Sequence, residues 1–345
     1  MNKTRVTELL GIEVPVIQAG MAGGVTTPEL IAAVSEAGGF GTLGAGYMEP
    51  EAMKESIREV KKQTSSPFGV NLFVPEEDKS TDNDTEEAME ALHPFHEELE
   101  MKDAVRPESP SVFYEQVEGA LAETVPVVSF TFGVPPEDVV TSLKQAGITL
   151  IGTATTVEEA LLNEEAGMDA VVVQGSEAGG HRGTFNGRFD KAAIGLMSLL
   201  PQVADHISIP IIAAGGIMDK RGMDAASALG AEGIQLGTAF VTVKESGAEA
   251  VHKGAILKAT EADTVVTSVF SGKPARGLDN RFIQEMEGRK TLGYPLQNSL
   301  TKPIRKEAER QQNTEFMSLW SGQSPRLAQD VSAAEVIRNL IGPWG

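Results

Sequence analysis

Eight short runs of apolar, mostly β-branched residues recur along the chain. They occupy residues 14–21, 40–46, 68–73, 125–133, 148–155, 170–175, 209–217 and 233–240. None of them alternates strictly between apolar and polar residues, and this is typical of strands that are buried on both faces. Helical patterns separate most of the runs, and several end in Ala-Gly or Leu-Gly, where glycine can adopt the left-handed conformation that ends a helix. The chain therefore predicts a parallel sheet with helical crossovers.

The number of strands and the regular spacing of the last five favour a TIM (β/α)8 barrel, an α/β fold, over a doubly wound sheet. We expect the barrel over residues 1–240 and a smaller helix-rich lid domain, inserted after the eighth strand, over 241–320. Residues 321–345 would return to the barrel and end in a closing helix. The acidic segment 75–110 interrupts the rhythm after the third strand and predicts a solvated, partly helical excursion.

Composition limits the classes of function. The 345 residues carry a formal net charge of −20, which disfavours nucleic acid and anionic membranes as partners. No apolar stretch approaches the roughly 18 residues of a membrane helix, and the N-terminus does not resemble a signal peptide. Because there are no cysteines, disulfides and thiolate sites are excluded. We expect a cytoplasmic protein, and a homodimer is compatible with the sequence.

No metal site is expected. Asp78, Asp82 and Asp84 resemble part of a calcium loop, but the glycine and the bidentate glutamate of such a loop are missing. His93 and His96 stand three residues apart without an evident third ligand, so we interpret both as surface histidines.

Glycines gather where the strands end, which is the working face of a barrel. The clearest pair is "IIAAGGI" followed by "GIQLGTAF", after the seventh strand and at the eighth. These positions match the phosphate cradle of such barrels, in which backbone N–H groups receive an anion. The alternative is that the glycines serve tight turns only. The candidate cradle residues are Gly215, Gly216, Gln235, Leu236, Gly237 and Thr238.

Two amides stand in otherwise apolar strands. Asn71 lies inside the third strand and Gln174 ends the sixth. Buried amides need hydrogen-bond partners, and these two could bind a flat ring rich in donors and acceptors, such as a flavin. The alternative is an internal hydrogen bond to a neighbouring loop.

The stretch "QGSEAGGHRGTF", residues 174–185, combines adjacent glycines with His181 and Arg182 at the working end. An imidazole there could move a proton near neutral pH, and together with Arg182 it could hold an anion. A structural histidine is the alternative. The chain has no G-x-G-x-x-G fingerprint opening a helix after a strand, so the sequence does not support NAD(P) binding in the Rossmann mode.

These motifs, with "GVNLFVP", "FSGKPARGLDNRF" and "LWSGQSPR", together resemble the nitronate monooxygenase family from about residue 5 to about residue 327. The resemblance implies a TIM barrel that holds FMN without a covalent bond, under a helical domain. It also implies oxidation of alkyl nitronates, such as propionate 3-nitronate, with O₂ to a carbonyl compound and nitrite.

By motif, the resemblance also implies roles for individual residues. His181 would be the active-site histidine, and Arg182 would help it to bind the anionic substrate. The residues implied to contact FMN are Gln18, Ala19, Gly20 and Met21 at the ring; Asn71, Gln174, Gly179 and Gly180 at the ring or ribityl chain; the cradle residues at the phosphate; and Ser321, Gly322 and Gln323 on the returning segment.

Two alternatives differ in class. The FMN-dependent enoyl-acyl carrier protein reductases share the architecture and a similar Gly-Gly-His loop, but they use NADH and a long acyl substrate. A non-catalytic flavin-binding protein is disfavoured, since the histidine loop would then have no purpose.

Overall fold

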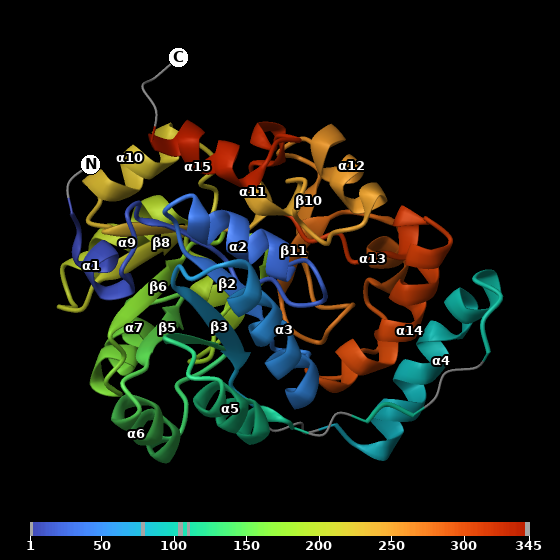
Figure 1. The fold of residues 1–345 in the computed structure, drawn as a ribbon. Coiled ribbons are helices and arrows are strands. Elements are labelled where there is room, and N and C mark those ends of the chain that lie inside the picture. The colour runs from blue at the N-terminus through green and yellow to red at the C-terminus, as the bar shows by residue number, and fades with distance from the viewer. Residues whose placement is uncertain (1–2, 77–79, 103–105, 109–110, 342–345) are drawn as a thin grey trace.

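The computed structural model describes residues 3–76, 80–102, 106–108 and 111–341 (Figure 1). Asp78 lies outside these residues. No helix among the described residues is long and apolar enough to cross a membrane.

In the part of the chain that the structure describes, eight parallel strands form one sheet in the order β1-β9-β8-β6-β5-β4-β3-β2. A parallel bridge between Ile17 and Phe40 joins the two ends of this order, and it closes the barrel. The TIM-barrel prediction is confirmed. The strands are β1 (Val16–Gln18), β2 (Gly41–Gly44), β3 (Phe68–Phe73), β4 (Val127–Thr131), β5 (Thr149–Ala154), β6 (Ala170–Gln174), β8 (Ile211–Ala214) and β9 (Gly233–Leu236).

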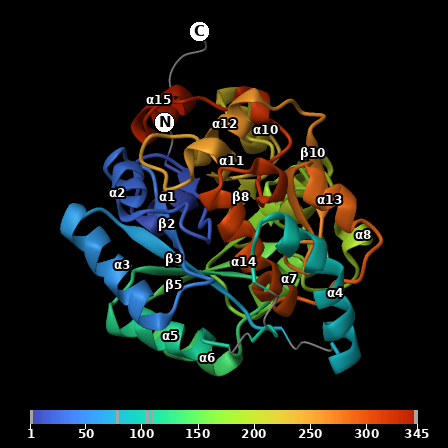
Figure 2. The same cartoon turned by 90° about the vertical axis from the view of Figure 1, so that its right-hand side faces the viewer.

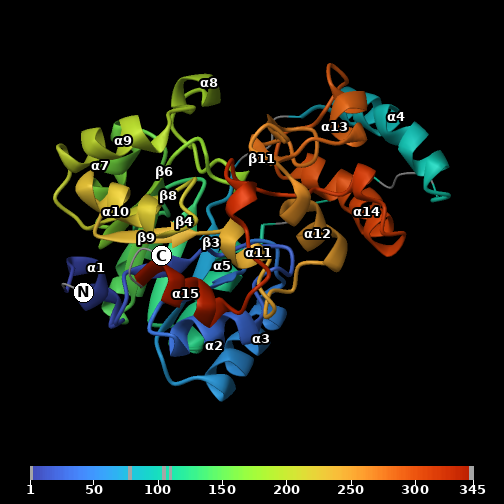
Figure 3. The same ribbon diagram turned by 90° about the horizontal axis from the view of Figure 1, so that it is seen from above.

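Helices surround the barrel (Figure 3). Four of their C-terminal turns carry the predicted left-handed glycines: Gly38, Gly147, Gly167 and Gly230 have φ of 85°, 76°, 86° and 105°. The helices are α1 (Arg5–Leu10), α2 (Pro28–Glu36), α3 (Pro50–Gln63), α5 (Phe113–Ala122), α6 (Glu137–Gln145), α7 (Val157–Glu165), α8 (Phe189–Ala192), α9 (Leu196–Ala204), α10 (Lys220–Ala228), α11 (Thr238–Val241) and α15 (Ala333–Ile341).

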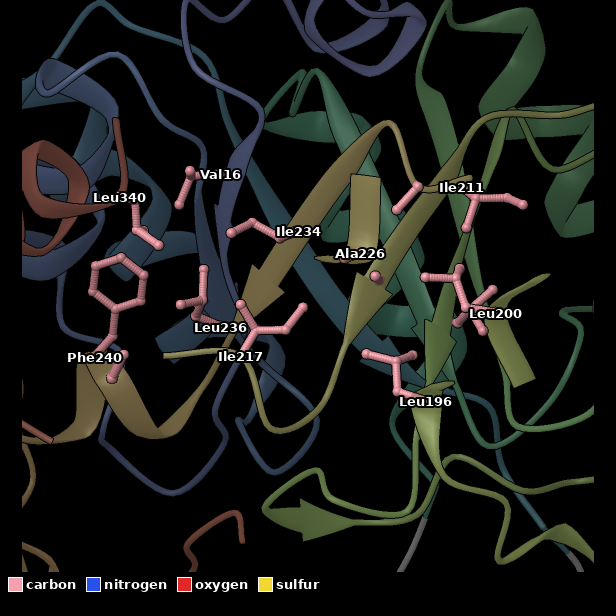
Figure 4. Packing of buried hydrophobic residues seen from close by; sticks show 14 of the residues in the cluster. Val16, Leu196, Leu200, Ile211, Ile217, Ala226, Ile234, Leu236, Phe240 and Leu340 are labelled. Carbon is pink, nitrogen blue, oxygen red and sulfur yellow. The ribbon is translucent and has the colours of Figure 1, made fainter. Parts of the chain in front are cut away.

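The largest core cluster lies between the strands and the helices, where β-branched residues of the sheet meet leucines and aromatic rings of the helices. Figure 4 shows this packing for Val16, Ile211 and Ile234 of the strands, with Leu200 and Leu340 from α9 and α15. A second cluster fills the barrel interior and includes Val6 and Leu10 of α1. Helix α1 packs into that interior cluster at one end of the barrel. A binding site can therefore form at the opposite end, where the strands have their C-termini.

A second body covers one side of the barrel (Figure 2). It contains helices, as predicted, and also a three-stranded antiparallel sheet in the order β10-β11-β7. The third strand of that sheet, β7 (Gly180–His181), comes from the loop after β6, so the histidine loop is part of the lid. The other elements are α12 (Ala250–Lys258), β10 (Thr264–Thr267), β11 (Ala275–Leu278), α13 (Arg281–Met286), α14 (Leu296–Arg310), η1 (Thr314–Phe316) and η2 (Pro325–Leu327).

The described part of the acidic segment 75–110 is partly helical as predicted, but one face of its helix is buried rather than solvated. Its helix α4 (Asp82–Glu98) packs against α14 of the lid. Leu92 and Phe95 are 0% and 1% exposed in the lid core, because the apolar residues of α4 recur at helical spacing on one face.

Two details of this segment also differ from expectation. His96 is 2% exposed and is not a surface histidine, whereas His93 is exposed. Asp82 pairs with Arg106, and Asp84 accepts hydrogen bonds from Thr81 at the start of α4 and pairs with Lys290. Both carboxylates therefore have structural partners.

Candidate active site

A cavity lies at the C-terminal ends of the barrel strands, below the lid. It encloses about 1370 Å³ of empty space, including its open mouth, and small-molecule sites usually have about 300–1000 Å³. Strand ends supply its floor, and His252 and Trp320 of the lid region contribute to its wall. Most of the residues implicated by sequence line it: Ala19, Gly20, Met21, Asn71, Gln174, Gly179, Gly180, His181, Gly215, Gly216, Gln235, Leu236, Gly237, Thr238 and Gly322.

Three predicted cofactor residues do not line the cavity. Gln18 is 0% exposed, and its amide bonds the backbone of Thr42, accepting from the Thr42 N–H at 3.1 Å. It therefore fastens β1 to β2. Ser321 is also 0% exposed and donates to the carbonyl of Gly322. Gln323 is exposed, and its backbone N–H donates to the carbonyl of Glu177 at 2.9 Å. The neighbouring Ser324 lines the cavity instead.

Arg182 does not line the cavity, contrary to the position that its predicted role in substrate binding requires. It is 1% exposed. Its guanidinium donates to the carbonyls of Gln174, Gly175 and Ala192 at 3.0, 2.5 and 2.9 Å. Burial lowers its pKa to about 10, so it stays charged at neutral pH and holds the loop after β6 to the loop before α9.

The glycine cradle has the backbone shape that the sequence indicated. Gly215 and Gly216 have φ of 118° and 70°, a region that side chains rarely adopt. Ser324 Oγ donates to the Gly216 carbonyl at 3.1 Å, and the Gly322 N–H donates to Thr238 Oγ1 at 2.8 Å. The returning segment therefore closes the cradle from the side.

Gly179 lines the cavity, and it also has a packing role that the sequence did not indicate. A Cβ atom there would lie 2.4 Å from the Gly322 nitrogen, so this glycine lets the histidine loop pack on the returning segment. Gly180 has φ 71° and would place a Cβ in open space. At Gly180 the conformation of the backbone, rather than crowding, calls for glycine.

Both amides line the cavity, and both also make internal hydrogen bonds. The Asn71 amide nitrogen donates to Ser129 Oγ at 3.0 Å and to Thr131 Oγ1 at 3.1 Å, and its side chain lines the cavity. Both polar atoms of the Gln174 side-chain amide bind the histidine loop. The amide nitrogen donates to the His181 carbonyl at 3.0 Å, and the amide oxygen accepts from the Gly183 N–H at 2.8 Å. Gln174 is thus an internal brace at the cavity wall.

His181 lies among aromatic rings. Its ring centroid is 5.7 Å from Phe132, 6.2 Å from Tyr294 and 5.5 Å from Trp320. Burial, followed by the positive charges of Arg305 and Lys273, lowers the pKa of His181 to about 3. The imidazole is therefore neutral at physiological pH, and the expected cationic pair with Arg182 does not exist.

Sequence reasoning missed the aromatic wall and a carboxylate that organises the histidine loop. Tyr47, Phe73, Phe132 and Trp320 line the cavity, but each comes from a different segment and single aromatic residues carry no motif. Glu159 is 0% exposed and accepts from the backbone N–H groups of Phe185 and Asn186 at 2.6 and 2.9 Å. Its burial could not be foreseen from an acidic helix start.

His252 is a second histidine of the cavity wall. It is 8% exposed, and its Nε2 lies 3.2 Å from the carbonyl oxygen of Trp320. Burial lowers its pKa to about 4, so it is also neutral at physiological pH.

A cavity at the catalytic end of a TIM barrel, with a neutral histidine beside a glycine cradle, is the arrangement of an enzyme site. Comparison with known proteins gives the class. A crystal structure of nitroalkane oxidase from Streptomyces ansochromogenes superposes with a TM-score of 0.92 at 41% identity, covering 97% of this chain and 96% of that one. The protein is an oxidoreductase.

The particular family follows from the sequence comparisons. The nitronate monooxygenase family profile matches residues 3–342. A probable nitronate monooxygenase of Staphylococcus saprophyticus is 49% identical, covering 98% of this chain and 96% of the relative. The chain belongs to the nitronate monooxygenase family.

A structural relative with another name is more distant. FabK from Thermotoga maritima superposes with a TM-score of 0.78 at 35% identity, over 99% of this chain and 96% of that one.

Proposed function

We propose that this protein is an FMN-dependent nitronate monooxygenase, which oxidises alkyl nitronates with O₂ to a carbonyl compound and nitrite. The observation that carries the proposal is the cavity itself: His181 and the glycine cradle line one space, in a chain that belongs to this family. A cytoplasmic location and a homodimer remain predictions from the sequence.

The residues present fit a flavin with one phosphate. Gly215 and Gly216 line the cavity, and a Cβ at either would crowd the loop after β6, at 3.1 Å from Ala178 N and 3.2 Å from Glu177 Cβ. Gly237 and Thr238 lie beside them, at the start of α11, where helix N–H groups lack intrahelical acceptors. We assign the phosphate to this cradle and the ring to the space between Met21 and Asn71. FMN would supply the electron-accepting ring that passes electrons from the substrate to O₂.

The residues of the chain would position the substrate and exclude water. Aromatic rings around His181 make an apolar wall, in which electrostatic interactions are stronger than in water. Arg305 and Lys273 contribute positive charge near His181, although Lys273 is paired with Glu76. They would favour an anionic nitronate over a neutral molecule.

For a neutral nitroalkane, His181 would have to remove the α-proton as a general base. The neutral imidazole is the form that can accept a proton. Its low pKa makes it a weak base, so we expect preformed nitronates to be the better substrates.

The enoyl reductase is the alternative, because FabK shares the fold and about a third of the sequence. The nitroalkane oxidase similarity is higher in both TM-score and identity, and it favours the nitronate interpretation.

One experiment tests the proposal and separates it from the alternative. The purified protein should be yellow and should release FMN, not FAD, on denaturation. Under anaerobic conditions, ethyl nitronate or propionate 3-nitronate should bleach the flavin quickly, and NADH should do so slowly or not at all. Rapid reduction by NADH, with enoyl thioesters as acceptors and no response to nitronates, would assign the protein to the reductases. A colourless protein that FMN does not reconstitute would refute both.

A further inference from the structure

One hydroxyl of the lid, that of Ser271, lies within hydrogen-bond distance of the His181 imidazole. Ser271 stands in the turn between β10 and β11 and is 1% exposed. Its Oγ lies 2.8 Å from His181 Nε2, which is the length of a good hydrogen bond. Either atom of this pair could be the donor when the bond is considered alone.

The other contacts of Ser271 decide the direction. A hydroxyl has one proton to donate and two lone pairs to accept with. Ser271 Oγ donates to the Lys273 carbonyl at 3.1 Å and accepts from the Lys273 N–H at 3.3 Å. All three contacts can form together only if His181 Nε2–H donates to Ser271, because a hydroxyl proton given to His181 would leave the Lys273 carbonyl without this donor.

We propose that Ser271 is a positioning residue that holds neutral His181 as the Nε2–H tautomer and leaves the lone pair of Nδ1 facing the cavity. Among the described residues, no protein group hydrogen-bonds to Nδ1, and His181 lines the cavity. In a neutral imidazole only one nitrogen carries a proton, so the hydrogen bond at Nε2 fixes which atom meets the substrate.

The consequence for chemistry rests on the proposed function. With a neutral nitroalkane, the α-C–H bond breaks, its electron pair moves into the nitro group to give the nitronate, and the proton forms the Nδ1–H bond. The resulting imidazolium keeps donating from Nε2 to Ser271. A preformed nitronate has already lost this proton, so its oxidation does not need proton removal by Nδ1.

The charged and titratable groups around the ring act against the imidazolium. Arg305 of α14 and Lys273 of the same turn are positive, the carboxylate of Glu76 pairs with Lys273, and the Tyr294 ring packs beside the imidazole. The Ser271 acceptor is therefore the hydrogen-bond partner that remains available to the charged ring.

The direct test is ¹⁵N NMR of the FMN-saturated protein, labelled at histidine, at pH 7. The His181 signals are assigned by their loss in His181→Gln. We expect a pyridine-type shift for Nδ1 and a pyrrole-type shift for Nε2. In Ser271→Ala the two shifts should move toward each other as both tautomers become populated, and Ser271→Thr should restore the wild-type pattern. Ser268→Ala is the matched control, since Ser268 makes no hydrogen bond to His181 within the described residues.

A kinetic split provides the second readout. Ser271→Ala should lower kcat on nitroethane by about two- to tenfold, the value of one hydrogen bond, with a smaller loss on ethyl nitronate. A pyrrole-type Nδ1 in the wild type, or unchanged shifts in Ser271→Ala, would overturn the proposal even if nitronates are oxidised. Absence of activity on both substrates would refute the proposed function but leave the NMR result to decide the tautomer.

Discussion

Arg182 belongs to the histidine-loop motif, but its side chain makes structural hydrogen bonds and does not face the cavity. A guanidinium offers five donors in a fixed fork, and three carbonyls of neighbouring loops accept from it. Glu159 and Glu177 balance its charge inside the protein. The sequence places this cation beside the active histidine, but chain position alone does not show that the side chain turns inward.

We predict that Arg182→Lys destabilises the protein by about 2–4 kcal/mol, because an ammonium cannot reach all three carbonyls and charge-assisted hydrogen bonds contribute about 1.5–3 kcal/mol each. Urea unfolding of the FMN-saturated protein measures this. Arg188→Lys is the control, since Arg188 is exposed and its ion pair is with the exposed Asp190, two residues further along the chain. If Arg182 bound substrate directly, its replacement would instead raise KM while leaving the urea midpoint unchanged.

The cradle glycines differ in what a substitution would test. At Gly216 the positive φ makes any side chain strained, so loss of FMN in a variant would not isolate the phosphate contact. Gly237 has φ −104°, and a Cβ placed there would have Met21 Sδ at 3.9 Å and Ala19 Cβ at 4.0 Å as its nearest neighbours. The backbone at Gly237 therefore accepts a side chain without clash.

We predict that Gly237→Ala leaves the unfolding midpoint nearly unchanged and weakens FMN binding at least about tenfold, because a methyl group would occupy the cavity wall where one backbone contact contributes about 1.5–3 kcal/mol. Flavin fluorescence titration gives the Kd. Gly254→Ala, in α12 with open space around it, should keep the Kd of the wild type. An unaltered Kd in Gly237→Ala would show that the FMN phosphate does not bind at this position.

At the scale of elements, the sequence predicts those helices and strands whose pattern depends only on neighbouring residues. Each barrel strand is a self-contained apolar run, and several crossover helices end at their own glycine, so both are readable from neighbouring residues. The sheet β10-β11-β7 is different, because His181 pairs with Ala275, far along the chain. Two residues of β7 carry no strand pattern, and only the folded barrel brings them to the lid.

The helix α4 differs from expectation for a related reason. Its acidic residues suggest a solvated segment, yet Ala88, Leu92, Phe95 and Leu99 share one buried face at helical spacing. That spacing is the signal in the sequence that could have revealed the buried face. The charges line the outer face, and what they cover is visible only once α14 is in place.

Phe95→Ala therefore tests whether α4 belongs to the lid core. Phe95 is 1% exposed and its ring centroid lies 4.7 Å from that of Phe282. Removing a buried phenyl ring costs about 3–5 kcal/mol, so we expect a loss of this size in urea unfolding. The exposed Glu90→Ala on the same helix should change stability by less than about 0.5 kcal/mol. Equal effects of the two substitutions on stability would show that α4 is not part of the lid core.

At the scale of the whole molecule, barrel and lid share the active histidine. The barrel loop supplies His181, and lid residues supply its β-sheet partner, its Ser271 contact and part of its aromatic wall. A chain with a net charge of −20 thus keeps a neutral histidine under two lid cations, Lys273 and Arg305. Local burial, rather than overall charge, sets the chemistry of the cavity.

The two histidines of the cavity wall, His181 and His252, also predict a pH dependence for the whole fold. The pKa of His181 is lowered to about 3 and that of His252 to about 4, both chiefly by burial, from an unfolded value of 6.5. Between pH 6.5 and 4 the unfolded chain therefore binds protons that the folded protein rejects, and stability must fall as pH falls through this window. Each histidine contributes a slope of up to about 1.4 kcal/mol per pH unit.

Urea unfolding of the FMN-saturated protein at pH 4 to 8 should show this slope below pH 6.5 and a plateau above it. The carboxyl groups with a lowered pKa, such as Asp84 and Glu307, add to the slope near and below their ordinary values of 3.8 and 4.5, so the slope between pH 6.5 and about 5.5 comes chiefly from the histidines. His252→Gln should remove part of the slope, since glutamine takes up no proton in either state. His206→Gln, at an exposed position, should retain the full slope. If His252→Gln follows the wild-type curve at every pH, the buried imidazole of His252 is not the group that links stability to acidity.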